Sequence, residues 1–157
     1  MSHADRLPSC FALVLVAVAA LFLGGCTSGS NIAGTYTGVY VTLGEFSVTP
    51  DRNSAPYGHI EFHVTNSGTL DHDFMVIRTD LAADALPTNA DGSYQQNGAG
   101  TVVLSGDSGE FSDVVHPGAP VILTRYLRPG HYVLISSTVA GGVSDYSRGM
   151  RAGLTVN

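Results

Sequence analysis

Apolar and polar residues alternate in short runs along most of this chain, and the alternation predicts β-strands. The segment 59–64, HIEFHV, alternates strictly, which places Ile60 and Phe62 on a buried face. Its two histidines, His59 and His63, fall on the opposite face with their Cα atoms about 13 Å apart, at ~3.3 Å per residue. That separation is too long for two ligands of one ion, so both histidines are expected at the solvated surface.

Further strand patterns follow one another at short spacing, separated by turn signals such as Asn66-Ser67-Gly68 and Arg128-Pro129-Gly130. No long segment shows the period of a helix, and Val and Thr are frequent. Seven or eight short strands at this spacing predict an all-β protein built as a β-sandwich. The other predicted strands are 39–48, 72–78, 102–104, 113–115, 121–127, 131–136 and 151–156.

Three segments between the predicted strands lack this alternation. Residues 80–86, DLAADAL, predict a helical turn that is capped by Asp80 and stopped by Pro87. Residues 89–100 are rich in Gly, Asn and Gln, and residues 139–148 are rich in Gly, so both segments are predicted to be loops.

One charged residue departs from the strand pattern. In the predicted strand 121–127, the period of two puts Arg125 on the inward face together with Leu123. A buried guanidinium needs a carboxylate or several carbonyl oxygens. We therefore expect either an ion pair with an acid such as Asp113 or Asp73, or a position where the sandwich opens and the side chain reaches water.

The N-terminal segment has the pattern of an export signal. A short polar stretch with Arg6 precedes an apolar run, 11–23, that is well short of the ~20 residues a membrane-spanning helix needs. The run ends in Leu23-Gly24-Gly25-Cys26, which resembles the bacterial lipobox. The resemblance implies a signal peptide over 1–25, cleavage before Cys26, and a diacylglyceryl group with acyl chains such as palmitate on the Cys26 thiol. The alternative is an ordinary signal peptide followed by an incidental cysteine.

Lipidation at Cys26 would anchor this lipoprotein to the cell membrane on its extracytoplasmic face, because two or more acyl chains hold a protein stably in a bilayer. Residues 26–36 are rich in Ser, Gly, Thr and Asn and are predicted to form a flexible tether. Residues 37–157 are then one domain, long enough to need no disulfide or metal to fold. Cys10 is removed with the signal peptide, so Cys26 is the only cysteine of the mature chain.

Charge is sparse in this chain, at 13% Asp, Glu, Lys and Arg, and the formal net charge is −6. All seven basic residues are arginines and form no basic run, so we expect no nucleic-acid partner. The sequence carries no phosphate-binding loop, dinucleotide fingerprint or Gly-x-Ser-x-Gly element. We therefore expect no catalytic residues and no enzyme activity.

Three segments together resemble the cupredoxins, the plastocyanin-like family of blue-copper proteins. Residues 66–76, NSGTLDHDFMV, match the pattern Asn-x-Gly-x-x-x-His-x-Phe-x-Val. Residues 127–136, LRPGHYVLIS, match Leu-x-Pro-Gly-x-Tyr-x-Leu-x-Cys except at the last position, and residues 146–156 resemble the closing Gly-Met and Leu-x-Val segment. The segments come in the family's order and frame the chain from Tyr36 to its end. The resemblance implies a cupredoxin-like Greek-key β-sandwich with a metal site at one end.

The resemblance also identifies the positions of the copper ligands. A type 1 copper centre needs two imidazoles, one thiolate and a weak axial methionine. The register places His72 at the first histidine, Ser136 at the cysteine and Met150 at the methionine. Counting back from Met150 puts Asp145 at the second histidine, whereas counting forward from Ser136 lands near Ala140-Gly141-Gly142. Neither count finds a histidine.

A serine hydroxyl is a poor copper ligand, so the resemblance predicts a degenerate site with no blue-copper centre and no resident cofactor. Two classes of function follow. The first is a binding or interaction module that presents the loops 139–148 and 89–100 to a protein partner. The second is residual handling of copper or another divalent metal ion through His72 with Asp145 and Met150. Electron transfer, the usual role of the family, ranks third because its essential thiolate is absent.

Overall fold

A computed structural model describes residues 36–96, 98–104 and 114–157 of the chain. The predicted signal peptide, the predicted lipidation site Cys26 and residues 26–35 of the predicted tether lie outside the described residues, as does Asp113. Within the described ranges, no helix has the length and apolar character that a bilayer crossing requires.

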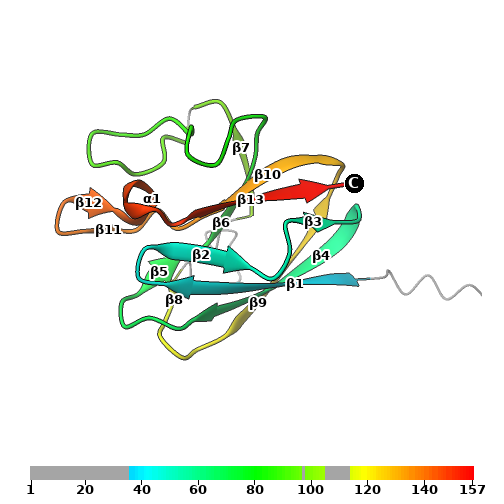
Figure 1. Ribbon diagram of the computed structural model, residues 1–157, viewed down its shortest axis with the longest axis horizontal. Coiled ribbons are helices and arrows are strands. Elements are labelled where there is room, and N and C mark those ends of the chain that lie inside the picture. The colour runs from blue at the N-terminus through cyan, green and yellow to red at the C-terminus, as the bar shows by residue number, and fades with distance from the viewer. Residues whose placement is uncertain (1–35, 97, 105–113) are drawn as a thin grey trace, which may run out of the picture. The chain divides into compact units, whose positions relative to one another are not determined.

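Two β-sheets form the layers of a sandwich, and the chain passes between the layers several times (Figure 1). Within the sheets β1 pairs parallel with β4 and β3 pairs parallel with β13, whereas the other pairings are antiparallel. The four-stranded sheet, in spatial order, contains β2 (Ser47–Pro50), β1 (Tyr36–Gly44), β4 (Gly58–Asn66) and β9 (Val121–Leu127). The five-stranded sheet contains β3 (Ser54–Ala55), β13 (Arg151–Val156), β10 (Gly130–Ile135), β6 (Met75–Arg78) and β7 (Thr101–Leu104).

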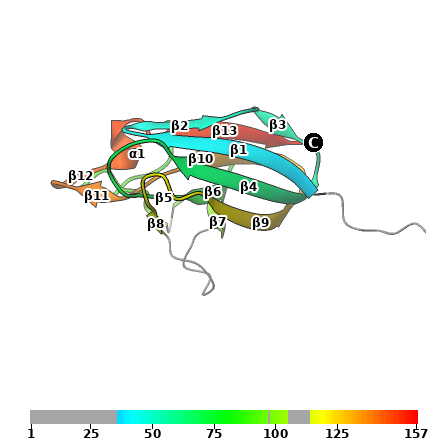
Figure 2. The same cartoon turned by 90° about the horizontal axis from the view of Figure 1, so that it is seen from below.

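Five short elements gather at one end of the sandwich, which we call the loop end. Tyr36 and the C-terminus lie at the opposite end, the terminal end, and both views show this separation (Figures 1 and 2). The elements of the loop end are β5 (His72–Asp73), which pairs with β8 (Val114–Val115), β11 (Val139–Ala140), which pairs with β12 (Val143–Ser144), and the helix α1 (Asp145–Arg148).

The main core lies between the two sheets, because the strands alternate as their sequences predict. In β4 the side chains of Ile60, Phe62 and Val64 are fully buried. Phe62 packs against Phe74 with ring centroids 5.6 Å apart. On the outer face of β4, His59 is exposed and His63 is partly exposed, which agrees with their predicted surface position.

A second apolar cluster covers the outer face of the five-stranded sheet. Ile77 of β6 and Val133 of β10 point into this cluster, and Leu86, Tyr94 and Tyr146 pack on them. Among the described residues, the members of both apolar clusters lie at or after Val39. Ile32–Asn157 forms a compact unit of its own, and it is long enough to fold by itself.

Most predicted strands are found at the predicted place, but the structure has more strands than predicted, and β3, β11 and β12 were not predicted. The predicted strands 121–127 and 151–156 have the observed bounds of β9 and β13. The predicted strand 39–48 is divided into β1 and β2 by a turn in which Phe46 has φ 65°. The predicted strand 72–78 is interrupted at Phe74, and the two main sheets hold four and five strands in place of seven or eight in total.

Two predictions for the connecting segments are wrong. Residues 80–86 form turns and no helix, with Ala85 N–H donating to Ala82 O at 2.9 Å, because burying Leu86 against the sheet outweighs local helix propensity. Residues 139–148 are not an irregular loop but the β11–β12 hairpin followed by α1.

Candidate functional site

The residues predicted at the ligand positions all lie at the loop end and are almost completely buried. His72 belongs to β5, Ser136 follows β10, Asp145 begins α1 and Met150 precedes β13. Their exposed fractions are 1%, 0%, 2% and 0% in that order. Ser136 N–H donates to Met150 O at 3.2 Å, and Met150 N–H donates to Asp145 O at 3.0 Å. Segments far apart in the sequence thus meet at this point.

The carboxylate of Asp145 is the centre of the site. Its Oδ2 atom lies 2.7 Å from His72 Nδ1 and accepts a hydrogen bond of 3.0 Å from Ser136 Oγ. An ionised carboxylate only accepts hydrogen bonds, so an ionised Asp145 requires the His72 hydrogen to be on Nδ1. One buried carboxylate therefore connects β5, the end of β10 and α1.

A second carboxylate, that of Asp73, reaches the same serine. Asp73 Oδ1 lies 2.7 Å from Ser136 Oγ, so the single hydroxyl hydrogen is shared between two carboxylates. The same oxygen accepts hydrogen bonds from the backbone N–H groups of Ser137 at 2.5 Å and Thr138 at 3.0 Å. We call the following four residues the buried cluster: His72, Asp73, Ser136 and Asp145.

Asp73 has a different role from the one considered in the sequence. It is bound to Ser136 and the backbone that follows, and it forms no ion pair with Arg125; the other candidate partner, Asp113, lies outside the described residues. Strict alternation would direct Asp73 away from His72, but β5 ends at Asp73 and the alternation ends with it. In the sequence, Asp73 directly follows His72, the predicted first ligand. This adjacency was the signal that could have identified Asp73 as a member of the site.

The second ring nitrogen of His72 has no partner. Nε2 is the only buried side-chain nitrogen or oxygen without a hydrogen bond among the residues that the structure describes. An unpaired buried polar atom costs about 1–3 kcal/mol. The interactions at Nδ1 and the packing around the ring must offset this cost.

The helix α1 positions Asp145. Ser144 caps the helix, because its Oγ accepts a hydrogen bond of 3.0 Å from Tyr146 N–H. Gly149 ends the helix with φ 120°, and a Cβ atom there would lie 3.1 Å from Phe46 O. Of the two sequence alternatives for the second histidine position, Asp145 lies in the buried cluster, whereas Gly142 lies in the exposed turn between β11 and β12.

The loop that leads into His72 is held by the Asn66-Ser67-Gly68 turn. Asn66 Nδ2 donates to Leu70 O at 2.7 Å and to Val115 O at 2.8 Å, and Gly68 N–H donates to Asn66 Oδ1 at 2.9 Å. A Cβ atom at Gly68 would lie 2.5 Å from Glu45 Oε1, so a side chain at this position would displace the glutamate. The turn therefore fixes both the β4–β5 connection and its contact with Glu45.

Glu45 binds the same loop from outside. Its Oε1 accepts hydrogen bonds from the backbone N–H groups of Thr69 and Leu70, the second at 3.0 Å. These bonds, with that from Thr69 first, lower the pKa of Glu45 from 4.5 to about 2. The ionised form of Glu45 thus stabilises the loop before His72.

Metal-binding capacity at the site is limited by its donors. Among the described residues, no group of three or more His, Cys, Asp or Glu side chains could hold a metal ion. Met150, the predicted thioether ligand, packs in the main core between the sheets. The predicted role of His72, Asp145 and Met150 as a residual metal site stays a prediction.

The fold is that of the cupredoxins. The structure is similar to reduced auracyanin from the photosynthetic bacterium Roseiflexus castenholzii, with a TM-score of 0.51 and 19% identity over 77% of this chain and 97% of that one. Auracyanin A, a "blue" copper protein from Chloroflexus aurantiacus, matches with a TM-score of 0.49 and 12% identity over 78% of this chain and 100% of that one. No protein-family profile and no curated protein matches the sequence. At these identities the likeness defines a cupredoxin-like β-sandwich and nothing finer.

Replacing Asp145 is expected to destabilise the fold. The substitution Asp145→Ala leaves His72 Nδ1 and Ser136 Oγ without this buried acceptor, so the free energy of unfolding should fall by about 2–4 kcal/mol. Urea denaturation followed by circular dichroism measures the change. The matched control is Asp71→Ala, which breaks an exposed His–Asp pair of 2.9 Å with His116 and should cost less than about 1 kcal/mol. Equal losses in the two variants would contradict the central role of Asp145.

Stability is expected to fall as the pH is lowered from 4.5 toward 2, in part through Glu45. Because the pKa of Glu45 is lower in the folded protein, ionisation favours folding above its ordinary pKa of 4.5, and this contribution is lost as the pH falls through the folded value of about 2. The substitution Glu45→Gln should flatten the dependence of the urea midpoint on pH in this window. Asp84→Asn, at an exposed carboxylate that forms no hydrogen bond or ion pair with a described residue, should keep the wild-type slope; the prediction fails if Glu45→Gln keeps it too.

Proposed function

We propose that this chain is a membrane-anchored extracytoplasmic lipoprotein whose cupredoxin-like domain acts as a binding module without a type 1 copper centre. The buried cluster is the observation that carries the proposal. Three of its side chains stand at predicted ligand positions, and they bind one another: His72 Nδ1 and Ser136 Oγ both contact Asp145 Oδ2. The groups that a metal would require are thus already joined by hydrogen bonds.

The donors at these positions do not fit type 1 copper, which depends on a cysteine thiolate. Ser136 follows β10 at the cysteine position, and its hydroxyl is hydrogen-bonded to two carboxylates. The two cysteines of the chain, Cys10 and Cys26, both precede the domain. This donor set supports a domain that kept the fold of the blue-copper proteins and uses it for another purpose.

The spacing of the donors supports the same proposal. Nitrogen and oxygen ligands lie about 2.0–2.2 Å from a metal such as zinc, so two ligands at a tetrahedral angle are about 3.3 Å apart. The observed separation of His72 Nδ1 and Asp145 Oδ2 is 2.7 Å, the length of a direct hydrogen bond. For both atoms to bind one ion, the pair would first have to separate.

The buried cluster also differs from a histidine-activated nucleophile. In that arrangement the imidazole accepts the proton of the serine hydroxyl directly. Here Ser136 and His72 contact the same carboxylate oxygen, and Ser136 is fully buried. We therefore assign the cluster a structural role, which is to fix the loops of this end, and we propose no catalysis at it.

A polar recess beside the cluster supports the function of a binding module. Its volume is about 520 Å³, which lies within the range of small-molecule and peptide-side-chain pockets, roughly 300–1,000 Å³. The recess lies between the loop 89–96 and the segment that follows β10. The polar side chains that line it are Asp73, Asn89, Ser93, Gln95, Gln96 and Ser137. Because Asp73 also binds Ser136, the cluster holds one wall of the recess in place.

Residual metal handling is the second candidate, and one observation favours it. The unpartnered Nε2 atom of His72 carries a lone pair when the ring hydrogen is on Nδ1, and a neutral imidazole nitrogen is a common metal ligand. Rearrangement of the pair with Asp145 would be needed before that carboxylate could join the same ion. The candidate partners are those predicted from the sequence, Asp145 and Met150.

A metal titration separates the two candidates. Purified protein titrated with Cu(II), Cu(I) or Zn(II) should not show the intense visible thiolate-to-copper absorption, because no thiolate is present in the domain. It should not show stoichiometric binding either, because His72 and Asp145 are already hydrogen-bonded to each other. Absorbance and isothermal calorimetry measure these two outcomes. Stoichiometric binding that His72→Ala abolishes and His116→Ala retains would replace the binding module with metal handling.

Lipidation of Cys26 is tested in cells. In a bacterial host that processes lipoproteins, the chain should incorporate an alkyne-tagged palmitate and fractionate with membranes, because the lipobox places Cys26 at the cleavage site. Cys26→Ala should lose both label and membrane association, whereas the matched substitution Cys10→Ala should keep them. Equal labelling of the two variants would show that the anchor is elsewhere or absent.

A further inference from the structure

A second recess lies at the terminal end and is lined by three arginines. It forms where β9, the edge of the four-stranded sheet, faces β6 and β7 of the five-stranded sheet, and its volume is about 270 Å³. Arg78 ends β6, Arg125 lies on β9, and Arg128 follows β9. The buried side chains of Leu127 and Tyr132 also line the recess. Arg125 is exposed, so its inward position in the strand pattern is accommodated where the sandwich opens.

Among the described residues, the three guanidinium groups have no carboxylate partner. Within the described part of the chain, no carboxylate lies within ion-pair distance of Arg78, Arg125 or Arg128, whereas Arg52 binds Asp51 at 2.7 Å. Arg78 Nη2 donates one hydrogen bond, of 3.2 Å, to a backbone carbonyl oxygen. Three of the seven basic residues of an acidic chain thus gather around one recess without counter-charges in contact.

Unpaired arginines in a recess with an apolar floor match a phosphate group. The guanidinium is planar and always charged, and its N–H donors bind phosphate oxygens in pairs. Asp80 lines the adjacent recess together with Arg78 without forming an ion pair with it, and its charge opposes an anion there. Among the described residues that line the recess shared by all three arginines, none is acidic.

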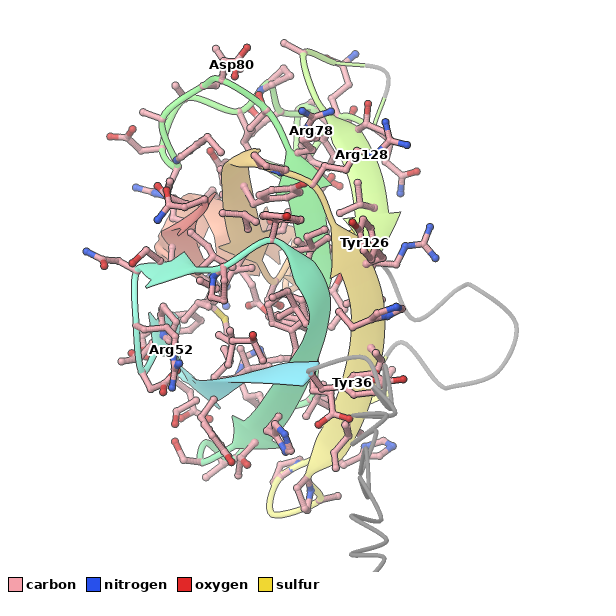
Figure 3. All side chains as sticks on the ribbon, turned by 90° about the vertical axis from the view of Figure 1, so that its right-hand side faces the viewer. Tyr36, Arg52, Arg78, Asp80, Tyr126 and Arg128 are labelled. Carbon is pink, nitrogen blue, oxygen red and sulfur yellow. The ribbon has the colours of Figure 1, made fainter. Side chains whose placement is uncertain are left out.

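The place of the recess in the fold indicates where the phosphate comes from. Figure 3, which looks onto the terminal end, shows Arg78, Arg128, Tyr126 and Tyr36 on this end of the sandwich. The described chain begins here, ten residues after Cys26. A Gly/Ser-rich chain of that length has an end-to-end distance of about 17 Å and cannot exceed roughly 36 Å. An anchor at Cys26 would therefore keep this end close to lipid headgroups.

Exposed tyrosines accompany the arginines. Tyr36 is 53% exposed and Tyr126 is 52% exposed, and Tyr57, directly before β4, is 61% exposed. Tyr57 N–H binds Asn157 O at 2.7 Å, which places it beside the C-terminus at the same end. Tyrosine is enriched at membrane interfaces, where its ring contacts lipid and its hydroxyl contacts water.

We propose that the recess of Arg78, Arg125 and Arg128 binds the phosphate groups of anionic phospholipids and holds the terminal end against the bilayer. The proposal rests on the lipid anchor proposed above, and it adds the orientation of the domain relative to the membrane. Because the loop end lies at the opposite end of the sandwich, the polar recess and the β11–β12 hairpin then face away from the membrane, toward a partner.

Vesicle binding tests the proposal without the anchor. The segment 27–157, which contains the compact unit Ile32–Asn157, is mixed with vesicles of phosphatidylcholine alone or with about 25% phosphatidylglycerol. The bound fraction is measured by co-sedimentation. Binding should require phosphatidylglycerol and weaken with salt. Each of Arg78→Gln, Arg125→Gln and Arg128→Gln should weaken binding about fivefold, and the triple variant more than about tenfold. Urea midpoints confirm that each variant is folded.

Two control variants lose one positive charge, as each single test variant does. Arg148→Gln removes a half-buried arginine at the loop end, which lies over the Phe46 ring, and Arg52→Gln removes one that is already paired with Asp51. Both variants should bind vesicles as the wild type does. Equal weakening by Arg148→Gln would overturn the recess in favour of net charge alone. Saturable binding of soluble glycerol phosphate without vesicle binding would overturn the assignment to lipid. Failure of the anchor appears separately, as unlabelled Cys26 in cells, and leaves the vesicle result unchanged.

Discussion

The loop end of this protein depends on the buried carboxylate of Asp145. A carboxylate with 2% exposure is tolerated only where donors replace its hydration, and here His72 and Ser136 supply them. Each donor belongs to a different element, so the same contacts that compensate the charge also join β5, the end of β10 and α1. Asp73 is a second carboxylate that accepts a hydrogen bond from Ser136, and its side chain also lines the polar recess.

The sandwich separates two surfaces of different chemistry. At the loop end, amide, hydroxyl and carboxylate groups line the polar recess, and the buried cluster holds one of its walls in place. At the terminal end, three arginines that have no carboxylate partner among the described residues surround a smaller recess next to exposed tyrosines. The close-packed core between the ends keeps their separation constant. We propose that one end meets the bilayer and that the other is thereby presented to a binding partner.

Sequence patterns were most successful where one face of a strand is buried and the other is solvated. The alternation at Ile60, Phe62 and Val64 is reproduced in β4 because each apolar side chain enters the core between the sheets. The pattern failed for 80–86, where the second apolar cluster draws Leu86 onto the outer face of a sheet. The helical pattern of residues 80–86 does not predict this packing, because the second apolar cluster is assembled from residues of several distant segments.

The sequence by itself predicted most of the strands and turns, because each is set by a local pattern of apolar and polar residues. Its resemblance to the cupredoxins predicted three ligand positions, namely His72, Ser136 and Met150. The tertiary structure decided which residues bind one another. Only the packed chain brings Asp145 to His72, joins Asp73 to Ser136 and gathers the three arginines around one recess. These contacts link segments far apart in the sequence, and the geometry that makes them hydrogen bonds or charge clusters exists only when the two sheets are packed.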